Sequence, residues 1–229
     1  MFYNNQNSND LELIIEKTPE IPSSNIEYDT ITINGGENLT KIKGFSDITL
    51  KFDFAYFATP EEYLFKKARI DSWLLSEINK YLTYSLDEFI IYKVKKISIN
   101  NTTTTSRIMR HFSVTFTCQG LKYMTSGLEP IEVTNGAILN NFGSYEAEPI
   151  LKIYGSGNIS VSIGGKSFAI NNVSGYVSLD SEIKECYKDS ANKGKDMVGE
   201  WPILPIGSSI ISWTGSITKL EITPRWRCY

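Results

Sequence analysis

Residues 59–82 are the one stretch of the sequence that predicts a helix. In the other segments apolar and polar residues alternate, which is typical of β-strands. Thr59 can accept a hydrogen bond from the first turn, Pro60 is tolerated at the first helical position, and Glu62 can close a capping box. Such a helix needs a sheet to cover, so we predict a mainly β protein with one helix. Apolar residues at helical spacing predict its buried face: Leu64, Ala68, Ile70, Leu74, Leu75, Ile78 and Leu82.

The composition is that of an ordinary globular protein, with 41% hydrophobic and 21% charged residues in a chain of 229. This length allows one large or two small domains. The formal net charge of −3 and the lack of a basic block argue against a dedicated nucleic-acid binder. The Asn-rich start does not have the order of a secretory signal. We therefore expect synthesis in a cytosol, with Cys118, Cys186 and Cys228 as free thiols.

The first half is predicted to form strands around the helix. A short apolar strand covers residues 11–15, and alternation marks strands at 28–33, before the turn Asn34-Gly35-Gly36, and at 48–57. After the helix, residues 88–99 and 107–117 read as two long strands. The polar segment 100–106 between them is predicted to be the tip of a long, projecting hairpin.

A change of composition at residues 128–144 marks the predicted domain boundary. The first domain is expected over residues 1–140, with the last residues 224–229 as a segment that can rejoin it, and the second over 141–223. The second domain reads as short strands at regular spacing, which is typical of a small β-sandwich. Its predicted strands are 149–154, 159–163, 167–170, 175–180, 208–213 and 216–222, with turns at 155–158, 164–165 and 214–215.

Residues with catalytic or metal-binding chemistry are few. His111 is the only histidine, and no nucleophile turn lies near it in the sequence. One histidine and three scattered cysteines offer no metal-ligand spacing. We predict no catalytic residue, no cofactor and no metal site, although paired carboxylates for glycoside hydrolysis remain an enzyme alternative. The sequence favours a binding or structural protein.

Two tryptophans of the second domain, Trp201 and Trp213, are the candidate residues for carbohydrate contact. An aromatic ring at strand spacing more often packs in a core than against a sugar. A carbohydrate-binding, lectin-like accessory module is therefore the alternative function.

Motifs along nearly the whole chain share their order with one family of proteins. The first half carries Trp73-Leu74-Leu75 at the helix end and then Phe112-Ser113-Val114-Thr115-Phe116-Thr117-Cys118. The second half carries Glu148-Pro149-Ile150-Leu151-Lys152-Ile153-Tyr154-Gly155, Trp201-Pro202-Ile203-Leu204-Pro205-Ile206-Gly207 and Ile222-Thr223-Pro224-Arg225-Trp226-Arg227. This order resembles the distal tail proteins of siphophages and of related tail-like particles.

The resemblance implies an N-terminal β-sandwich with one α-helix and a long β-hairpin, similar to the tail-tube subunit. Its copies are expected to close into a homo-oligomeric ring, a hexamer in the family. The C-terminal domain would be a galectin-like β-sandwich outside that ring. Such a protein joins the tail tube protein to tail-tip and receptor-binding proteins, and DNA passes through the ring. We then expect a virion tail component, made in the host bacterial cytoplasm, without catalysis or membrane insertion.

Open strand edges pair by backbone hydrogen bonds, and this favours the polar hairpin tip as the place where one subunit meets the next. The candidate oligomer-interface residues are Thr102, Thr103, Thr104, Thr105 and Arg107.

Overall fold

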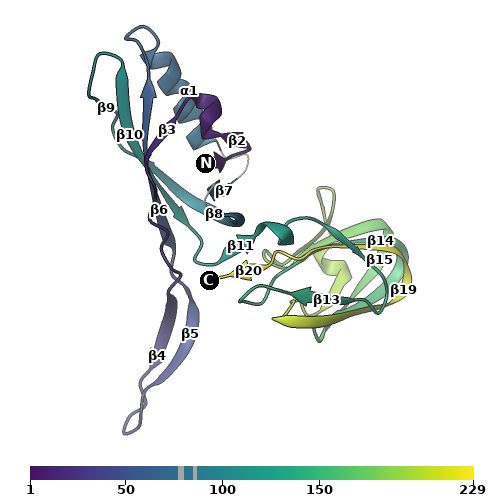
Figure 1. Cartoon of the computed structure of the whole chain (residues 1–229). Coiled ribbons are helices and arrows are strands. Elements are labelled where there is room, and N and C mark those ends of the chain that lie inside the picture. The colour runs from purple at the N-terminus through teal and green to yellow at the C-terminus, as the bar shows by residue number, and fades with distance from the viewer. Residues whose placement is uncertain (77–79, 85–86) are drawn as a thin grey trace. The chain divides into compact units, whose positions relative to one another are not determined.

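The computed structural model describes residues 1–76, 80–84 and 87–229, and its backbone is mainly β, as predicted (Figure 1). The chain divides into two compact units: unit 1 is Met1–Lys122 together with Tyr229, and unit 2 is Tyr123–Cys228. None of the helices in the described segments is long and apolar enough to cross a membrane. The division into a first domain of residues 1–140, rejoined by 224–229, and a second of 141–223 stays a prediction.

Unit 1 is built on an antiparallel sheet with strand order β2-β1-β7-β8-β10-β6-β3, and β9 pairs with β10. Two further strands, β4 and β5, form a separate two-stranded sheet. The elements are β1 (Phe2–Tyr3), β2 (Gln6–Asn7), the 3₁₀ helix η1 (Ser8–Leu11), β3 (Ile14–Lys17), β4 (Ile26–Ile31), β5 (Leu39–Phe45), β6 (Ile48–Phe57), α1 (Tyr63–Leu75), β7 (Tyr81–Tyr84), β8 (Asp87–Ile99), β9 (Thr103–Thr104) and β10 (Met109–Cys118).

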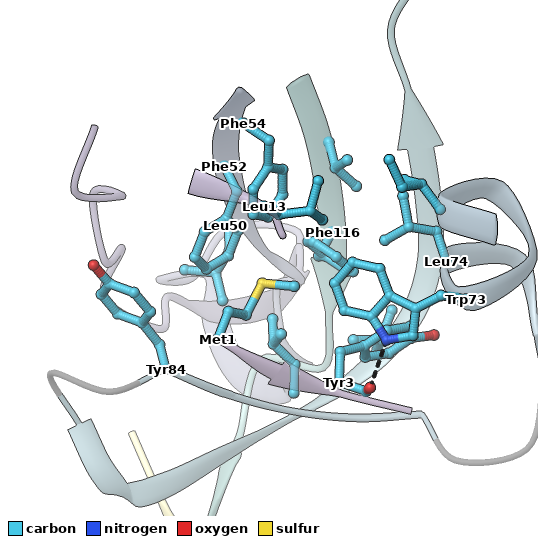
Figure 2. Packing of buried hydrophobic residues seen from close by; sticks show 14 of the residues in the cluster. Met1, Tyr3, Leu13, Leu50, Phe52, Phe54, Trp73, Leu74, Tyr84 and Phe116 are labelled. Atoms are coloured by element: carbon cyan, nitrogen blue, oxygen red, sulfur yellow. Dashed lines mark hydrogen bonds between the residues drawn. The ribbon is translucent and has the colours of Figure 1, made fainter. Parts of the chain in front are cut away.

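The core of unit 1 is an aromatic cluster between the sheet and the helix (Figure 2). Strand β6 has the bounds that the alternation predicted, and its inward residues Ile48 to Tyr56 are buried at every second position. Phe52 meets the ring of Phe116 from the neighbouring β10 edge-on, with centroids 5.8 Å apart. Tyr3 meets the same Phe116 ring at 5.3 Å, so the first strand of the chain closes this core.

The helix is shorter than predicted, and its predicted buried face is only partly right: Ile70 and Leu74 are buried, but Ala68 is exposed. The two hydrogen bonds of the predicted capping box form, because Thr59 N–H donates to Glu62 Oε2 at 3.1 Å and Glu62 N–H donates to Thr59 Oγ1 at 3.3 Å. They lie in the turn before α1, however, whose N-cap is Glu62 and not the predicted Thr59. The helix itself runs from Tyr63 to Leu75, and Leu82 belongs to β7. Ile78, which we assigned to the buried face, lies outside the described residues.

Trp73 determines which helix face turns inward. Its indole N–H donates to the carbonyl of Tyr3 at 2.9 Å, and its ring is buried with Ile70 and Leu74. These positions are spaced by three and four residues and so share one face. Leu64 and Leu75 then point outward, with exposed fractions of 73% and 62%, so their assignment to the buried face is wrong.

Unit 2 begins within β11 (Lys122–Met124) and is built on three long strands: β14 (Ile150–Ile163), β15 (Lys166–Asp180) and β19 (Gly207–Thr223). Strand β14 lies between the other two and pairs antiparallel with both. The remaining elements are the 3₁₀ helices η2 (Thr125–Gly127) and η3 (Gly194–Asp196), and the strands β12 (Ile131–Val133), β13 (Ile138–Asn141), β16 (Glu185–Lys188), β17 (Ala191–Asn192), β18 (Met197–Gly199) and β20 (Arg227–Cys228).

Each long strand replaces two short strands of the prediction. The segments 155–158 and 214–215 are not turns between strands; both lie inside a strand that continues across a register shift. Buried residues from both halves of each strand, such as Ile153 and Val161 of β14, belong to one core. The strands therefore bend, and each helps to enclose both sides of the same core.

Glycines at the bends explain why the strands pass so close together. A Cβ atom on Gly155 would lie 2.2 Å from the carbonyl oxygen of Ser216 on β19. Gly215 has φ +96°, and a Cβ there would lie 2.6 Å from the carbonyl oxygen of Asn158. Glycine signals a turn when it is read from sequence alone, but here it permits the close contact of two bent strands.

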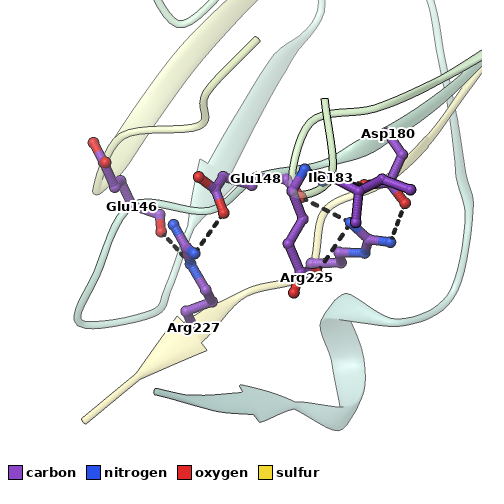
Figure 3. Close-up of polar contacts among 7 residues, drawn as sticks. Glu146, Glu148, Asp180, Ile183, Arg225 and Arg227 are labelled. Atoms are coloured by element: carbon purple, nitrogen blue, oxygen red, sulfur yellow. Dashed lines mark hydrogen bonds and ion pairs between the residues drawn. The ribbon is translucent and has the colours of Figure 1, made fainter. Parts of the chain in front are cut away.

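Ion pairs of Arg225 and Arg227 hold the C-terminal segment against the rest of unit 2 (Figure 3). The two Nη atoms of Arg225 lie 2.6 Å from the two carboxylate oxygens of Asp180, and Nη1 is 3.3 Å from Glu182. Arg227 Nη1 lies 2.7 Å from Glu148. Burial alone would raise the pKa of Asp180, but the hydrogen bonds and charge of Arg225 outweigh it and hold that pKa below its ordinary value.

Replacing Gly155 by Ala should destabilise the protein more than replacing Gly157, a neighbour in the same bend. Gly157 has φ +77° but open space at its Cβ position, so Gly157→Ala should cost about 1 kcal/mol of backbone strain. Gly155→Ala should cost about 3 kcal/mol, because β14 and β19 must move apart. Urea unfolding measures both losses. Equal losses would contradict the close-contact role of Gly155.

Asp180→Asn should lower the free energy of unfolding at pH 7 by about 3–5 kcal/mol, because Arg225 keeps its charge in a buried site without the carboxylate. A carboxyl group with a lowered folded pKa stabilises the fold above its ordinary pKa. That contribution is lost as the pH falls through the lowered value.

Unfolding followed between pH 7 and pH 2 should therefore show the difference between Asp180→Asn and wild type shrinking in acid. Glu200→Gln, in an exposed pair with Lys166, is the matched control and should change stability by less than about 1 kcal/mol. A pH-independent difference would show that the ion pair is not its cause.

Candidate functional site

The β4–β5 hairpin is the most exposed structured segment of unit 1. All of β4 and most of β5 are exposed, and the two strands pair only with each other (Figure 1). Tyr28 lies opposite Ile42, and Ile31 lies opposite Leu39, with exposed fractions of 52–57% for all four. Because strand residues alternate in direction, each face of the hairpin displays one of these apolar pairs.

An isolated two-stranded hairpin is marginally stable in water. Both outer edges of the β4–β5 hairpin carry backbone groups that have no strand partner within the described residues. At its base, Ser46 N–H donates to Asn25 O at 2.9 Å, and Ser24 Oγ donates to the carbonyl of Gly120. The hairpin is thus anchored at one end and open to a second protein along its length.

Sequence reasoning found only half of this hairpin. It placed a strand at 28–33 and the turn at 34–36, but it did not assign the returning strand β5. The available signal was the Asn34-Gly35 pair followed by a second run with Leu39 and Ile42, which together are typical of a hairpin.

The predicted interface residues lie in the segment that joins β8 to β10, where Thr103 and Thr104 form the short strand β9. Strands β8 and β10 have nearly the predicted bounds, but β10 pairs with β6 on one side and with β8 on the other, so its arm is interior to the sheet. The loop folds back as β9 onto β10, and the Arg110 guanidinium donates to the carbonyls of Ser106 and Arg107. Most of the loop is exposed, and its role in oligomer contact stays a prediction for Thr102, Thr103, Thr104, Thr105 and Arg107.

His111 lies beside a shallow hollow of about 760 Å³ that is lined by polar residues of β3, β6 and β10. Its Nδ1 atom is 2.8 Å from Glu16 Oε1, and Nε2 is enclosed. Lys17, Asp53 and Ser113 also line the hollow. Within the described segments, no three His, Cys, Asp or Glu side chains come together as metal ligands could. The geometry around His111 is that of a partly buried hydrogen-bonded contact with Glu16 in the sheet.

Trp201 and Trp213, the candidate carbohydrate-contact residues, are both half-buried against the core of unit 2. The Asn135 side chain makes two hydrogen bonds to the backbone of Trp213. Trp213 N–H donates to Asn135 Oδ1, and Asn135 Nδ2 donates to Trp213 O, each at 3.0 Å. Sugar contact by these two residues stays a prediction.

The cysteines are free thiols in different surroundings. Cys118 and Cys186 are buried, and burial raises the pKa of the Cys118 thiol to about 12 and that of Cys186 to about 11. Cys228 is half-buried.

Comparison with known proteins supports a fold assignment and no closer relationship. No family model matches the sequence, and no curated protein matches it. Among solved structures, the crystal structure of SPP1 Dit (gp 19.1) matches with a TM-score of 0.66 and 14% sequence identity, over 96% of this chain and 96% of that chain. That protein is described as a paradigm of the hub adsorption apparatus in phages that infect Gram-positive bacteria. The resemblance to distal tail proteins is therefore confirmed at the level of the fold.

Alkylation of the native protein should modify Cys228 much faster than Cys118 or Cys186. The thiolate is the reactive form, and both raised pKa values leave almost no thiolate at pH 8. Mass spectrometry after a timed iodoacetamide reaction measures the order of modification, and urea-unfolded protein serves as the control. Rapid modification of Cys118 in the folded protein would show that its core opens readily.

Proposed function

We propose that this chain is a distal tail protein of a phage or phage-tail-like particle, which connects the tail tube to the host-recognition proteins at the tail tip. The observation that carries this proposal is the shared fold with SPP1 Dit over 96% of both chains. The proposal assigns no catalytic step, and a structural connector needs none. Its partners would be further copies of itself, the tail tube protein and the tail-tip and receptor-binding proteins.

Ring formation, with six copies as the expected number, is the finer part of the proposal. Its support is the β4–β5 hairpin, since exposed apolar pairs and open strand edges are stabilised by a neighbouring subunit. A contact that uses one surface on each copy and a different surface on the next is heterologous, and such contacts form a ring where the rotation between neighbouring copies closes. DNA in transit would pass through the opening of such a ring.

The location of the protein in the particle gives a direct test. Immunogold electron microscopy of purified particles with an antibody against this chain should label one site per tail, at the end that carries the host-recognition proteins. Label spread along the tail would indicate a tube subunit instead. Label absent from intact and from disrupted particles would contradict a virion role.

The hairpin gives a matched pair of variants for the ring. Light scattering and negative-stain imaging of wild type should show rings of six subunits. Ile31→Ser with Leu39→Ser removes one exposed cross-strand pair and should give monomers that remain folded, because both side chains face solvent in the single chain.

Ile138→Ser with Ile210→Ser is the control, because these residues form an equally exposed cross-strand pair in unit 2. This control should still form rings. Wild type that stays monomeric at hundreds of micromolar, alone and with tail tube protein, would refute the ring.

A further inference from the structure

Two Asn-Gly pairs occur in the sequence, and both lie on the surface. Asn34-Gly35 forms the turn of the β4–β5 hairpin, and Asn135-Gly136 lies between β12 and β13. All four residues are exposed. Glycine has no Cβ atom, so its backbone nitrogen is open to attack on the amide carbon of the preceding asparagine. Exposure does not distinguish the two pairs, but their hydrogen bonds do.

The reacting groups of Asn34-Gly35 are unconstrained. The turn is closed by Gly36 N–H, which donates to the carbonyl of Ile33 at 3.2 Å. Gly35 has φ +79° after a residue at negative φ, which is typical of a type II turn. The space where a Gly35 Cβ would sit is open. Among the residues that the structure describes, neither the Asn34 side chain nor the Gly35 N–H makes a hydrogen bond.

The second pair is held at both reacting groups. Trp213 N–H donates to Asn135 Oδ1, and Asn135 Nδ2 donates to the carbonyl of Trp213, each at 3.0 Å. Gly136 N–H donates to the carbonyl of Ile211 at 2.8 Å. The Asn135 side chain therefore cannot turn toward the Gly136 nitrogen until these three hydrogen bonds break. The fold protects this pair and leaves the hairpin pair open to reaction.

The reaction available to an unconstrained Asn-Gly pair is loss of the side-chain amide. The glycine backbone nitrogen gives up its proton and attacks the asparagine Cγ atom. A new N–Cγ bond closes a five-membered succinimide ring, the Cγ–Nδ2 bond breaks, and ammonia leaves. Water then opens the ring. Attack of water at Cγ gives aspartate, and attack at the backbone carbonyl carbon gives isoaspartate, whose main chain runs through Cβ and Cγ.

We propose that Asn34 is a self-modification site, which converts to aspartate and isoaspartate in the free chain with water as the only co-reactant. The modification changes the closed end of the hairpin in two ways. Both products replace a neutral amide by a carboxylate, close in sequence to Glu37. Isoaspartate also adds one carbon atom to the backbone of the turn. Since β4 and β5 pair only with each other, this turn sets their register.

The consequence for assembly rests on the proposed function. The hairpin carries the exposed apolar pairs that support the ring contact, and their alignment depends on the register of β4 and β5. Chains that are modified before assembly should therefore enter rings poorly. Slow conversion of Asn34 would limit the time for which a newly made chain can assemble. The modification itself does not depend on the ring.

The chemical test incubates the purified full chain at neutral pH and follows both pairs by mass spectrometry. Trypsin separates them, because it releases peptides 18–41 and 123–152. In the folded protein Asn34 should react at least about tenfold faster than Asn135, since three hydrogen bonds hold the second pair. In the urea-unfolded chain the two rates should become similar. Asn34→Gln is the control, because a glutamine would have to close a less favourable six-membered ring, and position 34 should stay unmodified.

The assembly test uses light scattering on samples taken during the same incubation. The fraction of wild type in rings should fall as the modified fraction of Asn34 rises, whereas Asn34→Gln should keep its rings. Wild type that forms no rings even before incubation contradicts the proposed function and the assembly consequence together. The mass spectra still decide the modification in that case.

Three results would overturn the inference. Equal rates at Asn34 and Asn135 in the folded protein would show that the hydrogen bonds do not control the reaction. An Asn34 that stays intact while the unfolded chain is modified would show that the hairpin turn protects it. Fully modified wild type that assembles as well as Asn34→Gln would remove the consequence for assembly.

Discussion

Backbone hydrogen bonding is the constraint on which both units depend. Every strand must pair its N–H and C=O groups or leave them to water, and β10 satisfies this requirement by lying between β6 and β8. The β4–β5 hairpin satisfies it only internally, while it holds Tyr28, Ile31, Leu39 and Ile42 in solvent. A segment with open edges and exposed apolar pairs is most stable against another protein chain. The proposed assembly therefore rests on this one hairpin of unit 1.

In unit 2 the backbone of the long strands bends, whereas in unit 1 the β4–β5 hairpin leaves its edges open. Glycines at the bends of β14 and β19 let the same strands enclose both sides of one core. The buried pair between Arg225 and Asp180 then holds the C-terminal segment in place. The core of unit 2 and its C-terminal segment are thus held together by contacts within the unit.

The sequence predicted much of the fold where a strand or helix end depends on residues a few positions apart. The alternation of β6 predicted both its bounds and its inward residues, and the Thr59–Glu62 hydrogen bonds formed, although α1 begins after them. The helix face was only partly predicted, because counting apolar residues could not reveal that Trp73 would donate to Tyr3, 70 residues away. The polar start of the chain concealed strand β1, which closes the aromatic core. For the candidate site, the Asn34-Gly35 turn was found, but the exposure of the hairpin was not.

The sequence by itself determined the mainly β class, the positions of α1, β6, β8 and β10, and the order of motifs that resembles distal tail proteins. Those features depend on periodicity, capping and turn residues, which act over a few positions. Only the tertiary structure decided that Gly155, Gly157 and Gly215 lie inside bent strands instead of ending them. It also decided that Arg225 meets Asp180 and that Lys152 lies between Ser178 and Glu221. These contacts join residues far apart in the chain, and their geometry follows from strand register, which no local pattern specifies.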